Sequence, residues 1–188
     1  MNKTPAKNLH PLLRLHQLDV LIFHWTMKRK RLELIARLAR CVSHSADGFF
    51  YPLLALGLYL VNPDRGAPFA ASMALAFMLE RPLYWVLKNT LKRRRPPSAL
   101  PGFQSFIIPS DQFSFPSGHT SGAFVTAMLL CLFFPALSVP ALVWAALVGA
   151  SRVTLGVHFP TDIVAGATMG ATLAWSATRL LTGSGWLA

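Results

Sequence analysis

Charged side chains are scarce in this sequence, and acidic ones are the scarcest. Asp and Glu together number 7 among 188 residues, all charged residues make up 13%, and 53% of the residues are hydrophobic. The mean hydropathy is +0.44. A composition this apolar and this poor in charge excludes a typical soluble globular domain and favours a small membrane protein.

The sequence also has few cysteines, and it shows no secretory signal peptide at its start. The two cysteines, Cys41 and Cys131, stand ninety residues apart, and the second lies within an apolar run. This spacing indicates neither a disulfide framework nor a thiolate metal site. The first twenty residues lack the continuous apolar core and the small-residue cleavage site of a signal peptide. We therefore expect any insertion signal to be a retained span.

The basic residues that are present are unevenly placed. The net charge of +11 would by itself also suit a nucleic-acid-binding protein. However, nine of the eighteen Lys and Arg residues lie in the first forty positions, five more lie between 88 and 95, and no aromatic residues alternate with them. The pattern favours lipid headgroups and phosphate as partners over nucleic acid, and it indicates no obligate protein partner.

Long uncharged segments predict membrane-spanning helices. Residues 120–150 carry no formal charge, and these 31 residues exceed the ~20 that one helix needs to cross a bilayer. Pro135 and the 138–140 step divide this run into two antiparallel spans. The five predicted spans cover residues 49–61, 67–87, 119–136, 140–155 and 162–181. Glu80 and Arg81 fall inside the second span, so we expect them to form an ion pair away from the lipid tails.

The N-terminal region predicts helices of another kind. In residues 28–42, apolar positions at helical spacing alternate with Lys and Arg, as in a helix that lies in the headgroup plane. Residues 12–25 form only a weak additional span. The expected fold is an all-α, polytopic transmembrane bundle of five to six spans with an N-terminal amphipathic interfacial helix.

The domain boundaries follow from these segments. We expect a basic amphipathic region at 1–46, a membrane-embedded domain at 47–183 and a short tail at 184–188. Within the last span, Gly166 and Gly170 form a small-residue pair that permits close helix contact. Packing inside the monomer is favoured over dimerisation for this pair.

Polar residues that the composition does not predict occur in three stretches. These are KNTLKRRRP at 88–96, PSGH at 116–119 and SRVTLGVHFPTD at 151–162. Each stands where a predicted span begins or ends, so helix packing can bring all three to one cavity. The side chains gathered there would be Lys88, Arg95, Ser117, His119, Arg152, His158 and Asp162.

Such a cavity suits phosphoryl chemistry. Forked arginine donors and the amides at a helix start favour a phosphoryl group. One neutral imidazole can attack phosphorus while a second protonates the leaving oxygen. Asp162 follows His158 by four residues with Pro160 between them, which places the histidine on a loop and the carboxylate on the first helical turn, within reach of a hydrogen bond. No Asp-rich cluster is present, so no metal or cofactor is expected and the cations would neutralise the transition state.

The three stretches, written K-x6-RP, PSGH and SR-x5-H-x3-D, resemble the tripartite signature of the type 2 phosphatidic acid phosphatase superfamily, which includes the vanadium haloperoxidases. The resemblance implies that His158 is the phosphohistidine nucleophile and that Asp162 orients it. It also implies that His119 is the general acid and then the base that activates water. The implied phosphate-binding residues are Lys88, Arg95, Ser117, Gly118 and Arg152.

Neighbouring polar residues receive simpler interpretations. We interpret Lys92, Arg93 and Arg94 as the positive flank of a span. For Asp111, turn capping is favoured over contact with substrate. Ser151 suits phosphate contact and helix packing equally well. The remaining histidines are expected to be core or interfacial side chains: His10, His16, His24 and His44.

The favoured function is an integral-membrane lipid phosphatase that hydrolyses a phosphomonoester or diphosphate headgroup without metal. Phosphatidylglycerophosphate, phosphatidic acid and undecaprenyl diphosphate are the substrate types considered. The alternatives are a lipid phosphotransferase with the same phosphohistidine, a vanadate-dependent haloperoxidase and a non-catalytic protein that binds anionic lipid. The expected location is a bacterial inner membrane. The resemblance implies an active site on the extracytoplasmic side, whereas the positive-inside rule applied to five spans favours the cytoplasmic side.

Overall fold

The computed structural model describes residues 11–28 and 31–185, and the regular elements in these ranges are all helical. The all-α prediction is confirmed for this part of the chain. In chain order the helices are α1 (Pro11–Met27), α2 (Leu32–His44), α3 (Phe50–Val61), α4 (Pro63–Leu91), α5 (Pro96–Ala99), α6 (Gly118–Phe133), the 3₁₀ turn η1 (Pro135–Leu137), α7 (Ser138–Thr154) and α8 (Pro160–Gly183).

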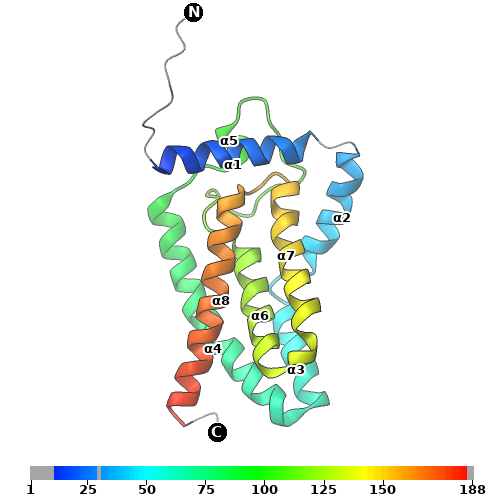
Figure 1. The fold of residues 1–188 in the computed structure, drawn as a ribbon, viewed down its shortest axis with the longest axis vertical. Helices are drawn as coiled ribbons and strands as arrows, with labels where there is room; N and C mark the ends of the chain where they lie inside the picture. The colour runs from blue at the N-terminus through cyan, green and yellow to red at the C-terminus, as the bar shows by residue number, and fades with distance from the viewer. Residues whose placement is uncertain (1–10, 29–30, 186–188) are drawn as a thin grey trace, which may run out of the picture.

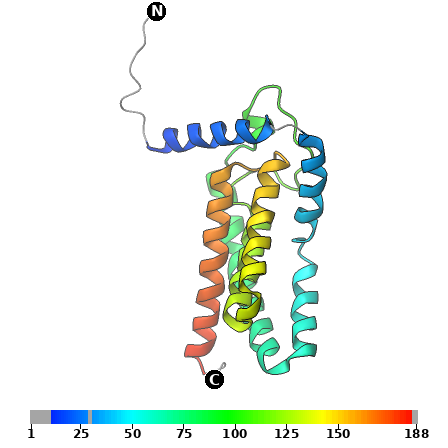
Figure 2. The same cartoon turned by 45° about the vertical axis from the view of Figure 1, so that its right-hand side comes forward.

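The long helices run side by side, and α1 lies across one end of them (Figures 1 and 2). Helix α6 is central, since it packs against α4, α7 and α8. The chain between α4 and α6 and the short connection from α7 to α8 lie at the end that carries α1 (Figure 1). The three polar stretches of the sequence therefore share one end of the bundle.

Each predicted span coincides with a helix, although the crossings themselves remain a prediction. Among the described residues, one helical stretch, 135–154, is both long and apolar enough to cross a bilayer by length and composition, while α3 and α6 are apolar but shorter. Helix α4 has 29 residues and contains the buried Glu80, which pairs with Arg81 as expected. The count of five to six crossings therefore stays a prediction.

The amphipathic helix expected at 28–42 takes a different position from the predicted one. Residues 29 and 30 lie outside the described part of the chain, and α2 begins at Leu32. This helix packs along α7 and runs roughly parallel to the bundle (Figure 2). Its buried Ala36 and Ala39 cluster with Leu155 and Val157, which follow α7. Its placement in the headgroup plane is thus not confirmed. The helix that lies across the bundle is α1, the weak additional span of the sequence analysis.

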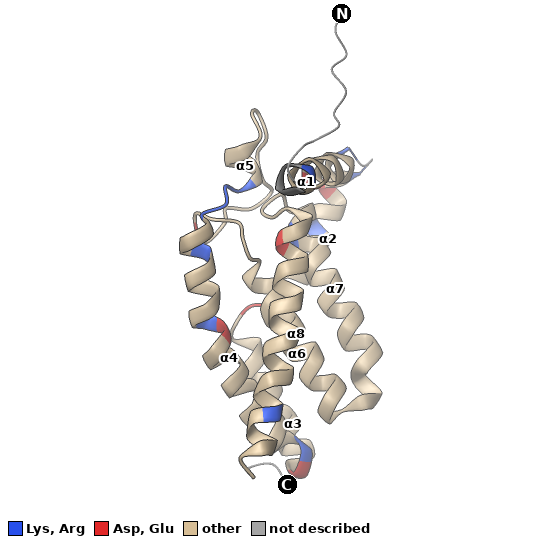
Figure 3. Ribbon diagram, turned by 60° about the vertical axis from the view of Figure 1, so that its left-hand side comes forward, with Lys and Arg blue, Asp and Glu red and all other residues tan. Residues whose placement is uncertain are grey.

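The outer surface of the long helices is apolar. Figure 3 shows α6 and α7 almost without charged residues, whereas basic residues gather in the chain between α4 and α5. Large hydrophobic side chains are exposed on α3, α4, α7 and α8, among them Leu60, Val61, Met78, Trp85, Val139, Val143, Leu147, Val164 and Trp175. Water would penalise so extensive an apolar surface, whereas a bilayer would stabilise it.

The pair Gly166 and Gly170 brings α8 against α6 inside the monomer. A Cβ at Gly166 would lie 2.6 Å from the backbone oxygen of Ser117, and one at Gly170 would lie 2.2 Å from the backbone oxygen of Ser121. Both contacts are shorter than any side chain tolerates, so these glycines set the distance between the two helices. The intramolecular role predicted for the pair is confirmed, and α8 is thereby held against the start of α6.

Substitution of Gly170 by Ala should destabilise the fold. The new methyl group would meet a backbone atom that cannot turn aside, and overpacking of this kind costs about 1–3 kcal/mol. Gly57→Ala is the matched control, because a Cβ at Gly57 meets nothing within 4 Å. Thermal unfolding in detergent should show a lower Tm for Gly170→Ala and an unchanged or slightly higher Tm for Gly57→Ala. Equal melting temperatures for both variants would contradict the packing role.

Candidate active site

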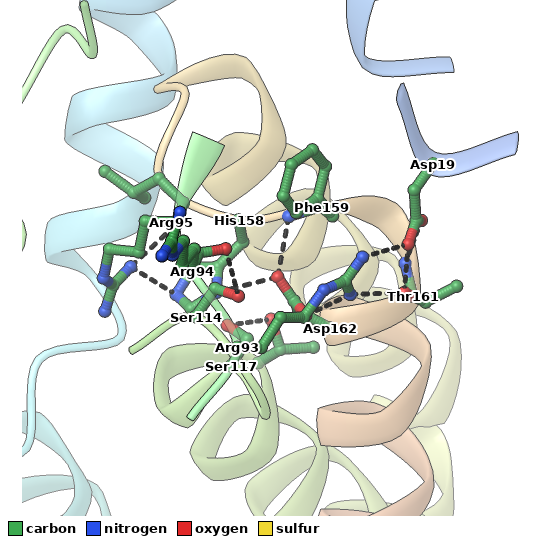
Figure 4. Close-up of polar contacts among 12 residues, drawn as sticks. Asp19, Arg93, Arg94, Arg95, Ser114, Ser117, His158, Phe159, Thr161 and Asp162 are labelled. Carbon is green, nitrogen blue, oxygen red and sulfur yellow. Dashed lines mark hydrogen bonds and ion pairs between the residues drawn. The ribbon is translucent and has the colours of Figure 1, made fainter. Parts of the chain in front are cut away.

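One cavity of about 730 Å³ collects most of the predicted site residues. Its polar wall contains Lys88, Arg95, Gly118, His119, Arg152 and His158. The two remaining predicted residues, Ser117 and Asp162, are fully buried behind this wall. The three distant segments therefore do meet in space, and the close-up in Figure 4 shows the part around His158.

The backbone conformation after α4 directs the side chain of Arg95 towards this cavity. Helix α4 ends where Lys92 adopts a left-handed backbone conformation with φ of 46°. Arg95 is extended, with φ of −74° and ψ of 158°, as expected for a residue that precedes a proline. Its guanidinium donates from Nη1 to the backbone oxygen of Val157 at 2.7 Å and from Nε to the backbone oxygen of Asp111 at 2.9 Å. The side chain is thus fixed between two loops.

The contact between Arg95 and His158 decides which imidazole nitrogen carries the lone pair. Nη1 of Arg95 lies 3.3 Å from Nε2 of His158. A guanidinium can only donate, so Nε2 must be the accepting, unprotonated nitrogen, and the ring proton of the neutral tautomer sits on Nδ1. Nε2 therefore carries the free lone pair of the neutral ring.

Burial keeps the His158 ring neutral. Loss of water around this fully enclosed side chain lowers the pKa of His158 to about 4, with Arg95 and Arg152 acting in the same direction and Asp162 in the opposite one. Nδ1 lies 3.6 Å from Oδ2 of Asp162, and it has no hydrogen-bond partner within the described chain. The hydrogen bond expected from the sequence spacing is therefore not formed in this structure, although the two groups face each other.

The carboxylate of Asp162 is held by the backbone N–H of Phe159 and by the guanidinium of Arg93. It occupies the first turn of α8, where Oδ2 accepts the backbone N–H of Phe159 at 2.7 Å. Oδ1 accepts a hydrogen bond of 2.6 Å from Nη1 of Arg93. The backbone oxygen of Asp162 accepts the N–H of Ser117 at 3.1 Å, so the PSGH turn is tied directly to α8. The reading of Arg93 as a simple positive flank is wrong, because its side chain bonds the carboxylate behind His158.

Asp111 makes ion pairs with two of the predicted phosphate cations. Its carboxylate oxygens lie 2.7 Å from Nζ of Lys88 and 2.5 Å from Nη2 of Arg95, and Tyr84 donates to it at 2.9 Å. Burial raises the pKa of Asp111, but the hydrogen bonds and charges of Lys88 and Arg95 outweigh it and bring the pKa to about 2. Asp111 therefore remains ionised at neutral pH and serves as a counter-ion, a role that the turn-capping interpretation missed.

A second carboxylate faces the other histidine. Nε2 of His119 lies 3.1 Å from Oδ1 of Asp47, whose other oxygen lies 3.0 Å from Nδ1 of the exposed His44. Burial raises the pKa of Asp47, yet the hydrogen bonds from His44 and His119 and their charges leave it lower than usual. Asp47 was missed in the sequence, where it stands next to Gly48 at the start of a predicted span.

The remaining predicted residues differ in how directly they reach the cavity. Arg152 is buried, donates to Oγ of Ser43 at 2.5 Å, and has an Nε donor without a partner among the described residues. Gly118 begins α6, so its amide lies in the first turn, where helix geometry leaves N–H groups free. Oγ of Ser117 accepts a hydrogen bond from Thr120 at 2.9 Å and does not line the cavity. Ser151 bonds the backbone oxygen of Val148, which fits the packing interpretation.

Comparison with known proteins decides the family. Residues 65–186, well over half of the chain, match the sequence model of the PAP2 superfamily. The chain belongs to the PAP2 superfamily. The resemblance carried by the three motifs is thereby confirmed, and every PAP2 motif residue lies inside the matched range.

Several curated relatives of the chain are phosphatases by name. The chain is 40% identical over 139 residues to phosphatidylglycerophosphatase B of Bacillus subtilis, covering 66% of this chain and 64% of that protein. It thus spans slightly less than two thirds of that relative's length.

Two solved structures share the fold. The transmembrane PAP2 type phosphatidylglycerolphosphate phosphatase of Bacillus subtilis has a TM-score of 0.69 at 29% identity, with 89% of this chain and 86% of that chain covered. LpxE of Aquifex aeolicus has a TM-score of 0.75 at 24% identity, with 94% and 99% covered.

The protonation of His158 can be measured in the free protein. Adding a proton would place a positive charge beside two arginines in a buried site, so the ring should remain neutral well below the usual pKa of about 6.5. ¹⁵N NMR of histidine-labelled protein in micelles, assigned with His158→Asn, should give a midpoint near 4 and an unprotonated Nε2 at pH 7. A midpoint near 6.5, or a protonated Nε2 in the neutral ring, would contradict the geometry.

Proposed function

We propose that this chain is an integral-membrane phosphatase that hydrolyses the phosphate headgroup of a lipid through a phosphohistidine. The observation that supports this most strongly is the two-part lining of the cavity. Cations and histidines lie at one end, and the other end is lined by side chains of α3 and α4, among them Tyr51, Ala55, Leu56, Ala70, Met73 and Phe77. A phosphorylated amphiphile matches both parts, whereas a soluble phosphate ester would leave the apolar part in contact with water.

In the first step, Nε2 of His158 attacks phosphorus and the bond from phosphorus to the leaving oxygen breaks. His119 donates a proton to that oxygen, so the product leaves as an alcohol. In the second step, His119 removes a proton from water, the water oxygen attacks phosphorus, and the P–N bond breaks to release phosphate and restore His158. Asp162 stabilises the positive charge that the ring acquires, and the hydrogen bond at Nδ1 would form as this charge develops.

Charge on the transferring phosphoryl group would be neutralised by side chains and by a helix start. The donors proposed are Lys88, Arg95, Arg152 and the amide of Gly118, whereas Ser117, which does not line the cavity, is proposed to support the PSGH turn instead of binding phosphate. Arg152 supports this role, since its buried Nε has no acceptor among the described residues. Asp111 already balances two of the cations, so an entering phosphate must compete with its carboxylate for Lys88 and Arg95. Such preorganised donors can replace a metal ion, which makes the proposed reaction independent of metal.

Phosphatidylglycerophosphate is the preferred candidate substrate, because the Bacillus subtilis relatives named above act on it by name. Phosphatidic acid and undecaprenyl diphosphate have the same combination of apolar tail and terminal phosphate. A lipid hydroxyl could replace water in the second step, which would make the protein a phosphotransferase. We further propose that the protein resides in a bacterial inner membrane with the cavity on the extracytoplasmic side.

The test is phosphate release by purified protein in detergent with EDTA present. Long-chain phosphatidylglycerophosphate should be hydrolysed much faster than glycerol 3-phosphate, because tail burial contributes about 25 cal/mol per Å² of apolar surface. His158→Ala should abolish release from both substrates. Loss of activity on chelation would contradict the metal-independent mechanism, and full activity of His158→Ala would contradict the nucleophile.

The apolar end of the cavity has its own variant. Ala74 on α4 lines it, and Ala74→Trp should raise KM for the long-chain lipid more than for a short-chain analogue. Val139→Trp, on the outward face of α7, is the control and should change neither value. Equal effects of Ala74→Trp on both substrates would contradict tail binding in this cavity.

Two other results would favour the alternative functions. Lipid binding without any turnover would favour the non-catalytic alternative, and halide oxidation with vanadate and peroxide would favour the haloperoxidase.

A further inference from the structure

The carboxylate of Asp162 is connected to a network that the proposed mechanism does not use. Arg93, in the chain that follows α4, donates from Nη1 to Oδ1 of Asp162 at 2.6 Å and to Oγ1 of Thr161 at 2.7 Å. Its Nη2 donates to Oδ2 of Asp19 on α1 at 2.5 Å. Figure 4 shows the guanidinium of Arg93 between the two carboxylates, on the side of Asp162 that faces away from His158.

Asp19 closes the network from the opposite side. Its Oδ1 accepts the backbone N–H of Thr161 at 2.9 Å, and its Oδ2 accepts the hydroxyl of Thr161 as well as Nη2 of Arg93. Asp19 is 2% exposed and Asp162 is 0% exposed, and among the described residues Arg93 is the arginine that forms an ion pair with both. A buried carboxylate without such a partner would be strongly destabilising.

The two carboxylate oxygens of Asp162 have different partners. Because Oδ1 is engaged by Arg93, the carboxylate cannot rotate freely, and Oδ2 is held towards the N–H of Phe159 and Nδ1 of His158. The guanidinium also lies over the ring of Phe159, with Cζ 4.6 Å from its centroid, and this contact restricts its own movement. Arg93 does not line the cavity, so it cannot serve as a phosphate ligand in this arrangement.

We infer that Arg93 and Asp19 are positioning residues for the reaction: they hold the Asp162 carboxylate so that Oδ2 faces Nδ1 of the nucleophilic His158. This inference rests on the proposed phosphohistidine mechanism. It also gives α1 a function, since Asp19 reaches the site from outside residues 65–186, the range that matches the superfamily. The helix that lies across the bundle end would thus complete the support of the nucleophile.

A kinetic double-mutant cycle tests the inference on the full chain with a long-chain lipid phosphate. Arg93→Gln should lower kcat about tenfold or more with KM nearly unchanged, as is usual when a supporting hydrogen bond behind a reactive group is lost. Asp19→Asn keeps the size of the side chain and should give a smaller fall in kcat. Arg94→Gln removes the same charge from the exposed neighbouring residue and should leave both constants unchanged.

The decisive comparison uses the Asp162→Asn background. If Arg93 acts only through the Asp162 carboxylate, the double variant Arg93→Gln/Asp162→Asn should be no slower than Asp162→Asn alone, within about twofold. If the double variant instead lost kcat by the product of the two single-variant reductions, that result would overturn the inference and indicate a general role of Arg93 in folding. A raised KM with unchanged kcat in Arg93→Gln would also overturn it, because that result would make Arg93 a substrate ligand.

Controls separate failure of folding and failure of the mechanism from failure of the inference. Where Arg93→Gln does not yield folded protein, as judged by thermal unfolding, Asp19→Asn takes its place in the same cycle and the same outcomes apply. Wild-type kinetics in Asp162→Asn itself would contradict the proposed function, and the inference with it. Normal loss of turnover in Asp162→Asn together with wild-type kinetics in both Arg93→Gln and Asp19→Asn would contradict the inference alone.

Discussion

The hydrogen bond from Arg95 to Nε2 of His158 is the interaction on which the site depends. A guanidinium cannot accept, so this bond directs the imidazole lone pair towards the cations and places the ring proton on the side of Asp162. The same arginine bonds the loops that carry Val157 and Asp111, and it therefore fixes the position of the His158 ring together with its tautomer. Close packing of α8 on α6, with Gly166 and Gly170 at the contact, keeps the supporting carboxylate within reach.

The positive charge of the site is balanced by carboxylates that lie outside the three sequence motifs. Asp111 pairs with Lys88 and Arg95, and Asp47 pairs with His119. Without these partners, the gathered cations would repel each other in a poorly hydrated cavity. In the proposed function, a dianionic headgroup would replace Asp111 as the partner of Lys88 and Arg95.

The sequence predicted the helical class and most of the cavity wall because both leave local signals. Uncharged runs mark the helices, and three short motifs carry residues such as His119 and His158 at span ends. The further partners were not predictable in the same way: Asp19 lies 143 positions before Asp162 and is linked to it through Arg93 and Thr161, and nothing local distinguishes Asp47 from a residue at a helix end. The placement of α2 in a headgroup plane is not confirmed, because an amphipathic pattern suits packing on α7 as well as it suits a membrane surface.

The most direct test of the account is to locate the phosphoryl group on the protein. Wild-type protein would be mixed with a long-chain lipid phosphate, quenched in alkali because the P–N bond is labile in acid, digested, and analysed by mass spectrometry and by separation of the two phosphohistidine isomers. The account predicts a single modified peptide with the phosphoryl group on Nε2 of His158. A phosphoryl group on Nδ1, a modified His119, or turnover without any phosphohistidine would contradict it.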